Sequence, residues 1–215
     1  MNHIASIVRS SLVLCTLASP VVVSAADPPP PPIVTRVNEA FASIDANHDG
    51  AMTFAEYRDF VFAAFAAADA DGNLTLTLSE IGADAGDRLA FAKIDRAKKG
   101  EVTLAEFMRM QRLLFDFADL DLNGSVSREE YLAIMLASGY GWIDADGDHR
   151  LNRAEYVSVL ANLFAALDAD RSGSLSAAEY AVFAATRPAS ASPDGSVSPA
   201  AFIEDGLRAL PADMR

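Results

Sequence analysis

The chain has 215 residues, of which 17 are Lys or Arg and 30 are Asp or Glu, so its formal net charge at pH 7 is −13. This acidity argues against nucleic acid or an anionic membrane surface as the main partner, because both require a basic footprint. About half of the residues are apolar and one is cysteine, which excludes a disordered polyelectrolyte, a disulfide scaffold and a cysteine-rich zinc protein.

Residues 1–26 are typical of a secretory signal peptide. Arg9 precedes a twelve-residue apolar stretch, 12–23, and small residues allow cleavage after Ala25 or Ala26. The stretch is too short for a membrane anchor, and no other segment is apolar enough to span a bilayer. We therefore expect a periplasmic or secreted protein.

Cleavage there removes Arg9 and Cys15, so the exported chain has 16 basic and 30 acidic residues, a net charge of −14 and no cysteine. Residues 27–34 contain five consecutive prolines, which predict a stiff, extended spacer before the first domain.

A twelve-residue pattern then recurs: Asp-x-[Asp/Asn]-x-[Asp/Asn/Ser]-Gly-x-apolar-x-x-x-Glu. Its windows begin at Asp45, Asp69, Asp95, Asp119, Asp144 and Asp168, with a weaker copy at Ser190. An aromatic residue stands four positions before each of the first six: Phe41, Phe65, Phe91, Phe115, Tyr140 and Phe164. Position 8 is always apolar: Met52, Leu76, Val102, Val126, Leu151, Leu175 and Val197. Agreement of loops and flanks indicates a true internal repeat.

The pattern resembles the calcium-binding loop of the EF-hand family. Calcium prefers six to eight oxygen ligands, and such a loop supplies them from positions 1, 3, 5, 7 (a backbone carbonyl), 9 and 12. The resemblance covers residues 35–210 and implies an all-α fold, a tandem array of short helices joined by metal-binding loops. We expect the array over 35–187, with its third window degenerate, and a degenerate seventh EF-hand with a C-terminal helix over 188–215.

Five windows carry a ligand set that fits a cation. The first, fourth and sixth satisfy every position of the pattern. The candidate ligands are Asp45, Asn47, Asp49, Ala51, Thr53 and Glu56; Asp69, Asp71, Asn73, Thr75, Thr77 and Glu80; Asp119, Asp121, Asn123, Ser125, Ser127 and Glu130; Asp144, Asp146, Asp148, Arg150, Asn152 and Glu155; Asp168, Asp170, Ser172, Ser174, Ser176 and Glu179.

The other windows depart from the pattern at informative places. The second has Leu74 at position 6, where a left-handed backbone costs a branched residue about 1 kcal/mol, so we expect weaker binding. The fifth has His149 there, which tolerates that backbone better. The third has Lys99 at position 5, a cation where the ion would sit, and the seventh ends in Ala201 instead of Glu. We expect neither of these two to bind metal.

Only 10 to 14 residues separate successive windows. One helix must then serve as the exit of one loop and the entry of the next, which places consecutive loops at its opposite ends. We therefore expect loops to pair with loops that are not their sequence neighbours. The segment 81–88 contains two glycines and is the weakest predicted helix.

Apolar stripes on these helices predict a shared core, or alternatively a groove that opens with calcium. One stripe is Phe54, Tyr57, Val61, Phe62 and Phe65; another is Leu104, Phe107, Met110, Leu114 and Phe115.

Export and close spacing together resemble a bacterial EF-hand subgroup of the lanmodulin type, which binds lanthanides. That subgroup has proline at position 2, whereas this chain has Ala46, Ala70, Arg96, Leu120, Ala145 and Ala169. It also favours Asp at position 9, where this chain has Thr53, Thr77, Ser127, Asn152 and Ser176. Fewer carboxylates suit a divalent ion, so Ca²⁺ is the expected ligand and a lanthanide the alternative.

The sequence thus predicts an exported, non-enzymatic calcium-binding protein with about five sites. It would act as a calcium buffer or as a module that grips a protein partner through a calcium-exposed apolar groove. Only His48 and His149 remain beyond the signal peptide, both inside loops, and no catalytic constellation is present. Metal ions are the expected partners, with no nucleic acid and no membrane span.

Overall fold

The computed structural model describes residues 31–82, 85–185, 191–208 and 210. The expected signal peptide and most of the proline run lie outside the described residues. Helix α2 (Ile33–Ile44) has Pro32 as its N-cap, so the helix starts two residues before the end of the expected spacer. None of the described helices is long and apolar enough to cross a membrane.

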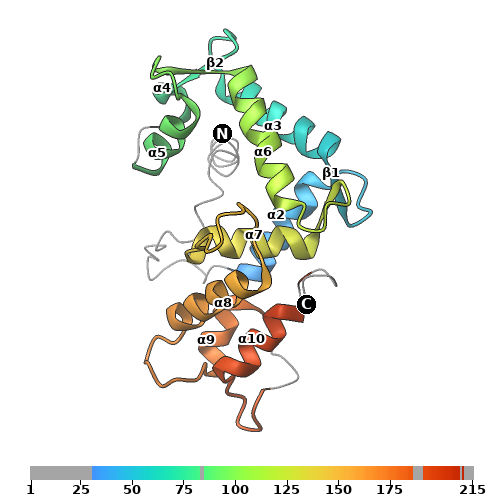
Figure 1. Ribbon diagram of the computed structural model, residues 1–215, viewed down its shortest axis with the longest axis vertical. Coiled ribbons are helices and arrows are strands. Elements are labelled where there is room, and N and C mark those ends of the chain that lie inside the picture. The colour runs from blue at the N-terminus through green and yellow to red at the C-terminus, as the bar shows by residue number, and fades with distance from the viewer. Residues whose placement is uncertain (1–30, 83–84, 186–190, 209, 211–215) are drawn as a thin grey trace.

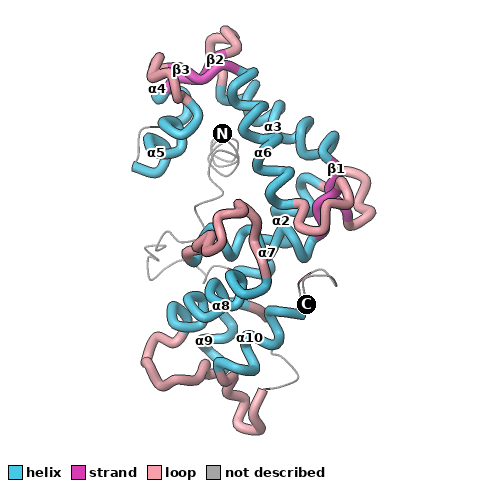
Figure 2. Tube along the Cα trace, in the orientation of Figure 1, coloured by secondary structure: helices cyan, strands magenta, loops and turns pink. Residues whose placement is uncertain are grey.

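The described chain is mainly helical, in agreement with the expected class, and adds three-residue strands at four of the loops (Figures 1 and 2). The further helices are α3 (Phe54–Ala68), α4 (Leu78–Ile81), α5 (Ala85–Ile94), α6 (Leu104–Ala118), α7 (Arg128–Tyr140), α8 (Arg153–Leu167), α9 (Ala177–Phe183) and α10 (Pro199–Arg208). The strands are β1 (Ala51–Thr53), β2 (Thr75–Thr77), β3 (Glu101–Thr103) and β4 (Ser125–Ser127).

Helices α3 and α6 form the long hairpin in the upper part of Figure 1. At one end β2 pairs with β3, and at the other β1 pairs with β4, both antiparallel. The two helices therefore run in opposite directions. Aromatic rings join them, with centroid distances of 5.3 Å for Phe65–Phe107 and 5.8 Å for Tyr57–Phe115. The fourth loop is thereby brought back beside the first.

The expected loop pairing is right for this outer pair and wrong for two others. The second and third loops, neighbours in sequence, pair through β2 and β3, and Leu175 of the sixth window bridges Val197 of the seventh. For the second and third loops the reason is that α4 ends after one turn at Gly82, whose φ of 118° is accessible to glycine. The chain turns there and starts a separate entry helix, α5.

The sixth and seventh windows also share a sheet bridge, so the domain boundary expected between residues 187 and 188 divides a pair of loops. Leu175 and Val197, which form the bridge, are both fully buried. The expected last helix is present as α10.

The lower part of Figure 1 is built around α8, which packs against α7 on one side and α10 on the other. Its inner face buries Tyr156, Leu160 and Leu163 completely. Phe202 of α10 closes this core against Phe183, with ring centroids 5.2 Å apart.

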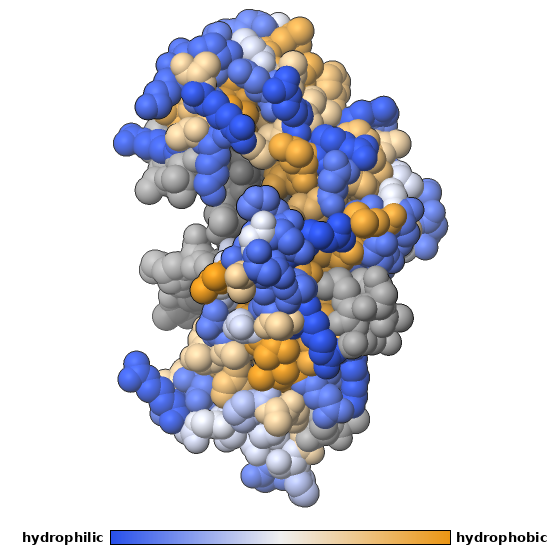
Figure 3. Space-filling model, in the orientation of Figure 1, coloured by the Kyte–Doolittle hydropathy of each residue, from blue (hydrophilic) through white to orange (hydrophobic). Residues whose placement is uncertain are grey.

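The face shown in Figure 3 alternates hydrophilic loop regions with hydrophobic patches along the helices. The predicted stripes are largely core, since Val61, Phe65, Phe107 and Phe115 are buried. Phe62 is an exception, because half of its side chain is exposed.

Candidate metal-binding loops

The first aspartate of each loop fixes the turn of the loop by accepting a backbone hydrogen bond. In each of the first six windows one carboxylate oxygen of position 1 accepts the N–H of position 6, at 2.8–3.1 Å. In five of these windows the N–H of the position-1 aspartate also donates to the carbonyl of the aromatic residue four positions earlier, as Asp45 does to Phe41. This hydrogen bond ends the entry helix. The repeated aromatic thus marks the last turn of the entry helix.

In the first six windows positions 4 and 6 both adopt a left-handed backbone, and each of these windows places one glycine and one other residue there. The residues other than glycine are His48, Leu74, Lys98, Leu122, His149 and Arg171, with φ between 53° and 63°. The second and fifth windows have their glycines at position 4, Gly72 and Gly147, instead of position 6. Every loop therefore carries one such residue, and the strain argument does not single out the second loop as weaker.

The glutamate at position 12 is tied to both ends of its loop. In the fourth loop Glu130 Oε2 accepts the N–H and the hydroxyl of Ser127, at 2.7 and 2.8 Å, while Oε1 accepts the N–H of Leu120 at 2.9 Å. The Ser127 hydroxyl in turn accepts the N–H of Glu130, which makes a capping box at the start of α7. Position 9 is therefore the N-cap of the exit helix as well as a candidate ligand.

These hydrogen bonds favour the ionised glutamate. The N–H of position 9 contributes most, and it holds the pKa of three carboxyls below the ordinary value: Glu56, Glu80 and Glu179. The ligand that a divalent cation needs is thus already deprotonated and oriented.

Carboxylates converge in four of the five candidate loops. In each, one oxygen from positions 1, 3 and 12 lies within 4.8 Å of the others: Asp69, Asp71, Glu80; Asp119, Asp121, Glu130; Asp144, Asp146, Glu155; Asp168, Asp170, Glu179. Such like charges repel in the absence of a cation. Their all-oxygen character fits calcium, which accepts six to eight oxygens in flexible geometry.

The first loop replaces the second carboxylate by Asn47 and does not form such a group among the described residues. Its fit to a cation rests on Asp45. This side chain is 2% exposed, and its Oδ1 is buried without a hydrogen-bond partner, whereas Oδ2 accepts the N–H of Gly50. A buried, unpartnered carboxylate oxygen is costly, and a bound cation would satisfy it.

The third loop holds a cation of its own. Lys99 Nζ lies 3.0 Å from Glu106 Oε2, as expected from its place at position 5. Hydrogen bonds from the N–H and the hydroxyl of Thr103, followed by the one from Lys99, lower the pKa of Glu106 to about 2. Asp95 keeps its loop-closing role, accepting the N–H groups of Lys99 and Gly100.

The fifth loop forms no strand, although its Leu151 is buried. It is joined to the fourth loop by side chains instead. The Arg150 guanidinium donates to the carbonyl of Leu120 at 2.7 Å, and Trp142 Nε1 donates to Glu155 Oε2 at 2.9 Å. Sequence reasoning did not include Trp142, because it lies outside the twelve-residue window.

The fold and loops define a helical repeat protein whose helix ends carry acidic, cation-ready loops. Comparison with protein families then gives the particular family: residues 37–61, 112–135 and 160–184 match the EF hand model. These segments contain the first, fourth and sixth loops, the three that satisfy every position of the pattern. The three matched segments and the converging carboxylates are consistent with the EF-hand family. No curated protein and no solved structure matches it.

Proposed function

We propose that this protein binds about five calcium ions and buffers calcium in the compartment to which it is exported. The observation that carries the proposal is the convergence of three carboxylate oxygens within 4.8 Å in four loops, together with the unpartnered oxygen of Asp45 in the fifth candidate. Each loop would hold the ion with its acidic and amide side chains and one backbone carbonyl.

The number of carboxylates favours a divalent ion. The five loops use 16 of the 30 acidic residues as ligands, three in each loop and four in the fifth. Five Ca²⁺ ions would bring the exported chain from −14 to −4. Position 9 is uncharged throughout, so the donor set does not provide the extra carboxylate that a trivalent lanthanide would favour. A lanthanide site is the competing outcome.

Direct measurement of stoichiometry tests the proposal. Equilibrium dialysis and calorimetry should give about five Ca²⁺ per chain, with Mg²⁺ and La³⁺ run in parallel. Glu56→Gln, Glu130→Gln and Glu179→Gln should each remove one ion, because each loses the bidentate ligand. Glu106→Gln, the same change in the third loop, should remove none. No calcium binding, or equal losses in all four variants, would refute the assignment.

A calcium-dependent interaction module is the second candidate. It is favoured by a small cavity of about 30 Å³ beside the outer loop pair, lined mainly by side chains of α6 and α7 that include Phe115 and Met135, together with Met52 of β1. Opening of this region on calcium binding would expose a groove. Calcium-dependent fluorescence of an apolar dye would support this role, and unchanged fluorescence would leave only the buffer.

Export and the absence of catalysis belong to the same proposal. Sequencing the N-terminus of the protein recovered from the periplasm or medium should show cleavage after Ala25 or Ala26. The carboxylates are used as metal ligands, so we propose no enzymatic activity.

A further inference from the structure

The fifth loop is connected to the fourth through an aromatic contact. Trp142 lies between α7 and the fifth loop, and its ring packs on Phe117, with centroids 5.0 Å apart. Phe117 stands in the last turn of α6, two residues before Asp119. The same indole donates through Nε1 to Glu155, whose side chain is buried at 4% exposure. The bidentate ligand of one loop is thus held from the entry helix of another.

A second connection runs between the loops themselves. The side chain of Arg150, at position 7 of the fifth loop, donates to the carbonyl of Leu120, at position 2 of the fourth. The N–H of Leu120 donates in turn to Glu130 Oε1. The peptide groups of Leu120 therefore contact both loops: its N–H bonds Glu130, the position-12 ligand of the fourth loop, and its carbonyl bonds the Arg150 guanidinium of the fifth.

We propose that Trp142 is a positioning residue for Glu155 and that it couples calcium binding at the fifth loop to calcium binding at the fourth. This inference rests on the proposed function. In the other candidate loops a neighbouring strand or bridge restrains position 8, whereas the fifth loop has no strand. Ordering of the fourth loop fixes Phe117 and Leu120. The fifth loop then loses less conformational entropy when it binds its own ion. Calcium binding at the fourth loop therefore favours calcium binding at the fifth, which is positive coupling.

Trp142 is the only tryptophan, so tryptophan emission reports on the one indole that joins Glu155 of the fifth loop to Phe117. Calcium titration should change its emission as Glu155 moves onto the ion. Glu130→Gln, which disables the fourth loop, should raise the midpoint of that change about fivefold or more, as expected for coupling of about 1 kcal/mol. Glu80→Gln, in the second loop at the far end of α3, should leave the midpoint unchanged.

Phe117→Leu supplies a variant outside the ligand set. Alone, Phe117→Leu should leave the ion count at its original value. Combined with Glu130→Gln, it should make the shift of the Trp142 midpoint smaller than Glu130→Gln causes in the otherwise unmodified chain. A midpoint insensitive to Glu130→Gln, or equally sensitive to Glu80→Gln, would overturn the coupling. These failures differ from failure of the proposed function, which would appear as no calcium in dialysis of the unmodified protein.

An independent observation concerns the third loop and the start of α6. All three lysines of the chain lie within residues 93–99, and residues 93–112 contain six basic and three acidic residues. This segment is +3, whereas the remainder of the chain is −16. The window that does not bind metal is therefore a basic region on an acidic protein.

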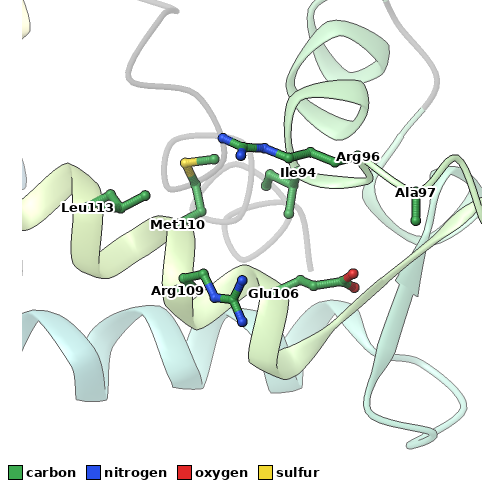
Figure 4. Close-up of a pocket in the computed structure, with 7 residues that line it drawn as sticks. All are labelled: Ile94, Arg96, Ala97, Glu106, Arg109, Met110 and Leu113. Carbon is green, nitrogen blue, oxygen red and sulfur yellow. The ribbon is translucent and has the colours of Figure 1, made fainter.

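A cavity of about 190 Å³ opens in this region (Figure 4). Arg96 from the third loop and Arg109 from α6 approach it from opposite sides, with Met110 between them. Leu113, another lining residue, is 54% exposed. Lys99 and Arg112 are engaged with Glu106 and Asp116. Within the described part of the chain the Arg96 and Arg109 side chains form no ion pair.

We infer that this cavity binds an acidic peptide segment that carries an apolar residue. Carboxylates of the peptide would pair with Arg96 and Arg109, and its apolar side chain would cover Met110 and Leu113. The acidic remainder of the molecule would repel such a peptide elsewhere, so charge selects this face.

The probe is a labelled peptide, acetyl-Glu-Glu-Leu-Glu-Glu-amide, measured by fluorescence anisotropy. The peptide should bind to the unmodified protein, and added salt should weaken this binding. The Arg96→Glu/Arg109→Glu variant should bind the peptide at least tenfold more weakly. Arg58→Glu/Arg208→Glu makes the same change of charge outside the cavity. This variant should lose no more than twofold in affinity for the peptide. No binding, or equal losses, would overturn the inference. So would a dimer, seen by sedimentation, that only the first pair of substitutions dissociates.

Discussion

The third loop offers the strongest test of how these loops recognise a cation. It retains Asp95, Gly100 and Glu106 but has alanine and lysine at positions 3 and 5. Ala97→Asp/Lys99→Asp removes the internal cation and completes the pattern. We expect the variant to bind one calcium ion more than the unmodified chain.

The expected magnitude follows from what is lost and gained. Without calcium the variant loses the Lys99–Glu106 pair, which is about one-third exposed and therefore stabilises the fold only weakly, and it adds carboxylate repulsion. With a dissociation constant of about 10⁻⁴ M, a calcium concentration of 10 mM stabilises the folded state by about 2.7 kcal/mol. That corresponds to a rise in melting temperature of about 5–10 °C.

Dialysis gives the ion count, and thermal unfolding with and without calcium gives the stability change. Ala97→Ser/Lys99→Met, which removes the lysine without adding carboxylates, should gain no ion. Glu106→Gln added to the aspartate variant should cancel the gain. An unchanged ion count in the aspartate variant, with the protein still folded, would refute the idea that Lys99 stands in for the metal.

Three further predictions concern stability. Gly206→Ala should cost about 1–3 kcal/mol in denaturant unfolding, because its Cβ would lie 2.7 Å from the Leu160 methyl groups; combining it with Leu160→Ala should give less than the sum of the two losses. Phe65→Ala should cost about 3–5 kcal/mol by the same assay, since its buried ring packs on Phe107 and links α3 to α6; an exposed-site cost below 0.5 kcal/mol would contradict that role. Acid should destabilise the calcium-free protein, because hydrogen bonds hold the folded pKa values of five position-12 carboxyls below the ordinary value of 4.5: Glu56, Glu80, Glu106, Glu155 and Glu179. Their contribution to stability is present above that pH and is lost as the pH falls through the folded values, with Glu106 protonating last near pH 2. Carboxyl titration by NMR checks that order, and Glu106 titrating near 4.5 would disprove it.

The loops were predictable because their chemistry is local. Twelve residues specify both the turn and the ligand set, so the sequence alone indicated the acids that converge and the lysine that lies against Glu106. The equivalence of positions 4 and 6 was not apparent from the ligand pattern. The glycines at positions 72 and 147 could have indicated it, since each stands two residues before a window position that lacks one.

Loop pairing was less predictable, because it depends on where a connecting helix is interrupted. Spacing alone predicted one helix between every two loops, which is right for α3, α6, α7 and α8. Gly82 ends α4 after one turn, and a single glycine in a predicted helix does not tell whether the helix bends, weakens or ends. The contact of Trp142 with Phe117 joins segments 25 residues apart and has no local signature.

The nested arrangement of the first four loops has a consequence for the order of folding. The partners Leu76 and Val102 are 26 residues apart, whereas Met52 and Val126 are 74 residues apart, so closing the inner pair first saves about 1 kcal/mol of loop entropy. Once α3 and α6 lie side by side, the outer strands meet without a further search. A substitution at Gly82 that delays the inner turn should therefore slow formation of the first and fourth loops as well, although it touches neither.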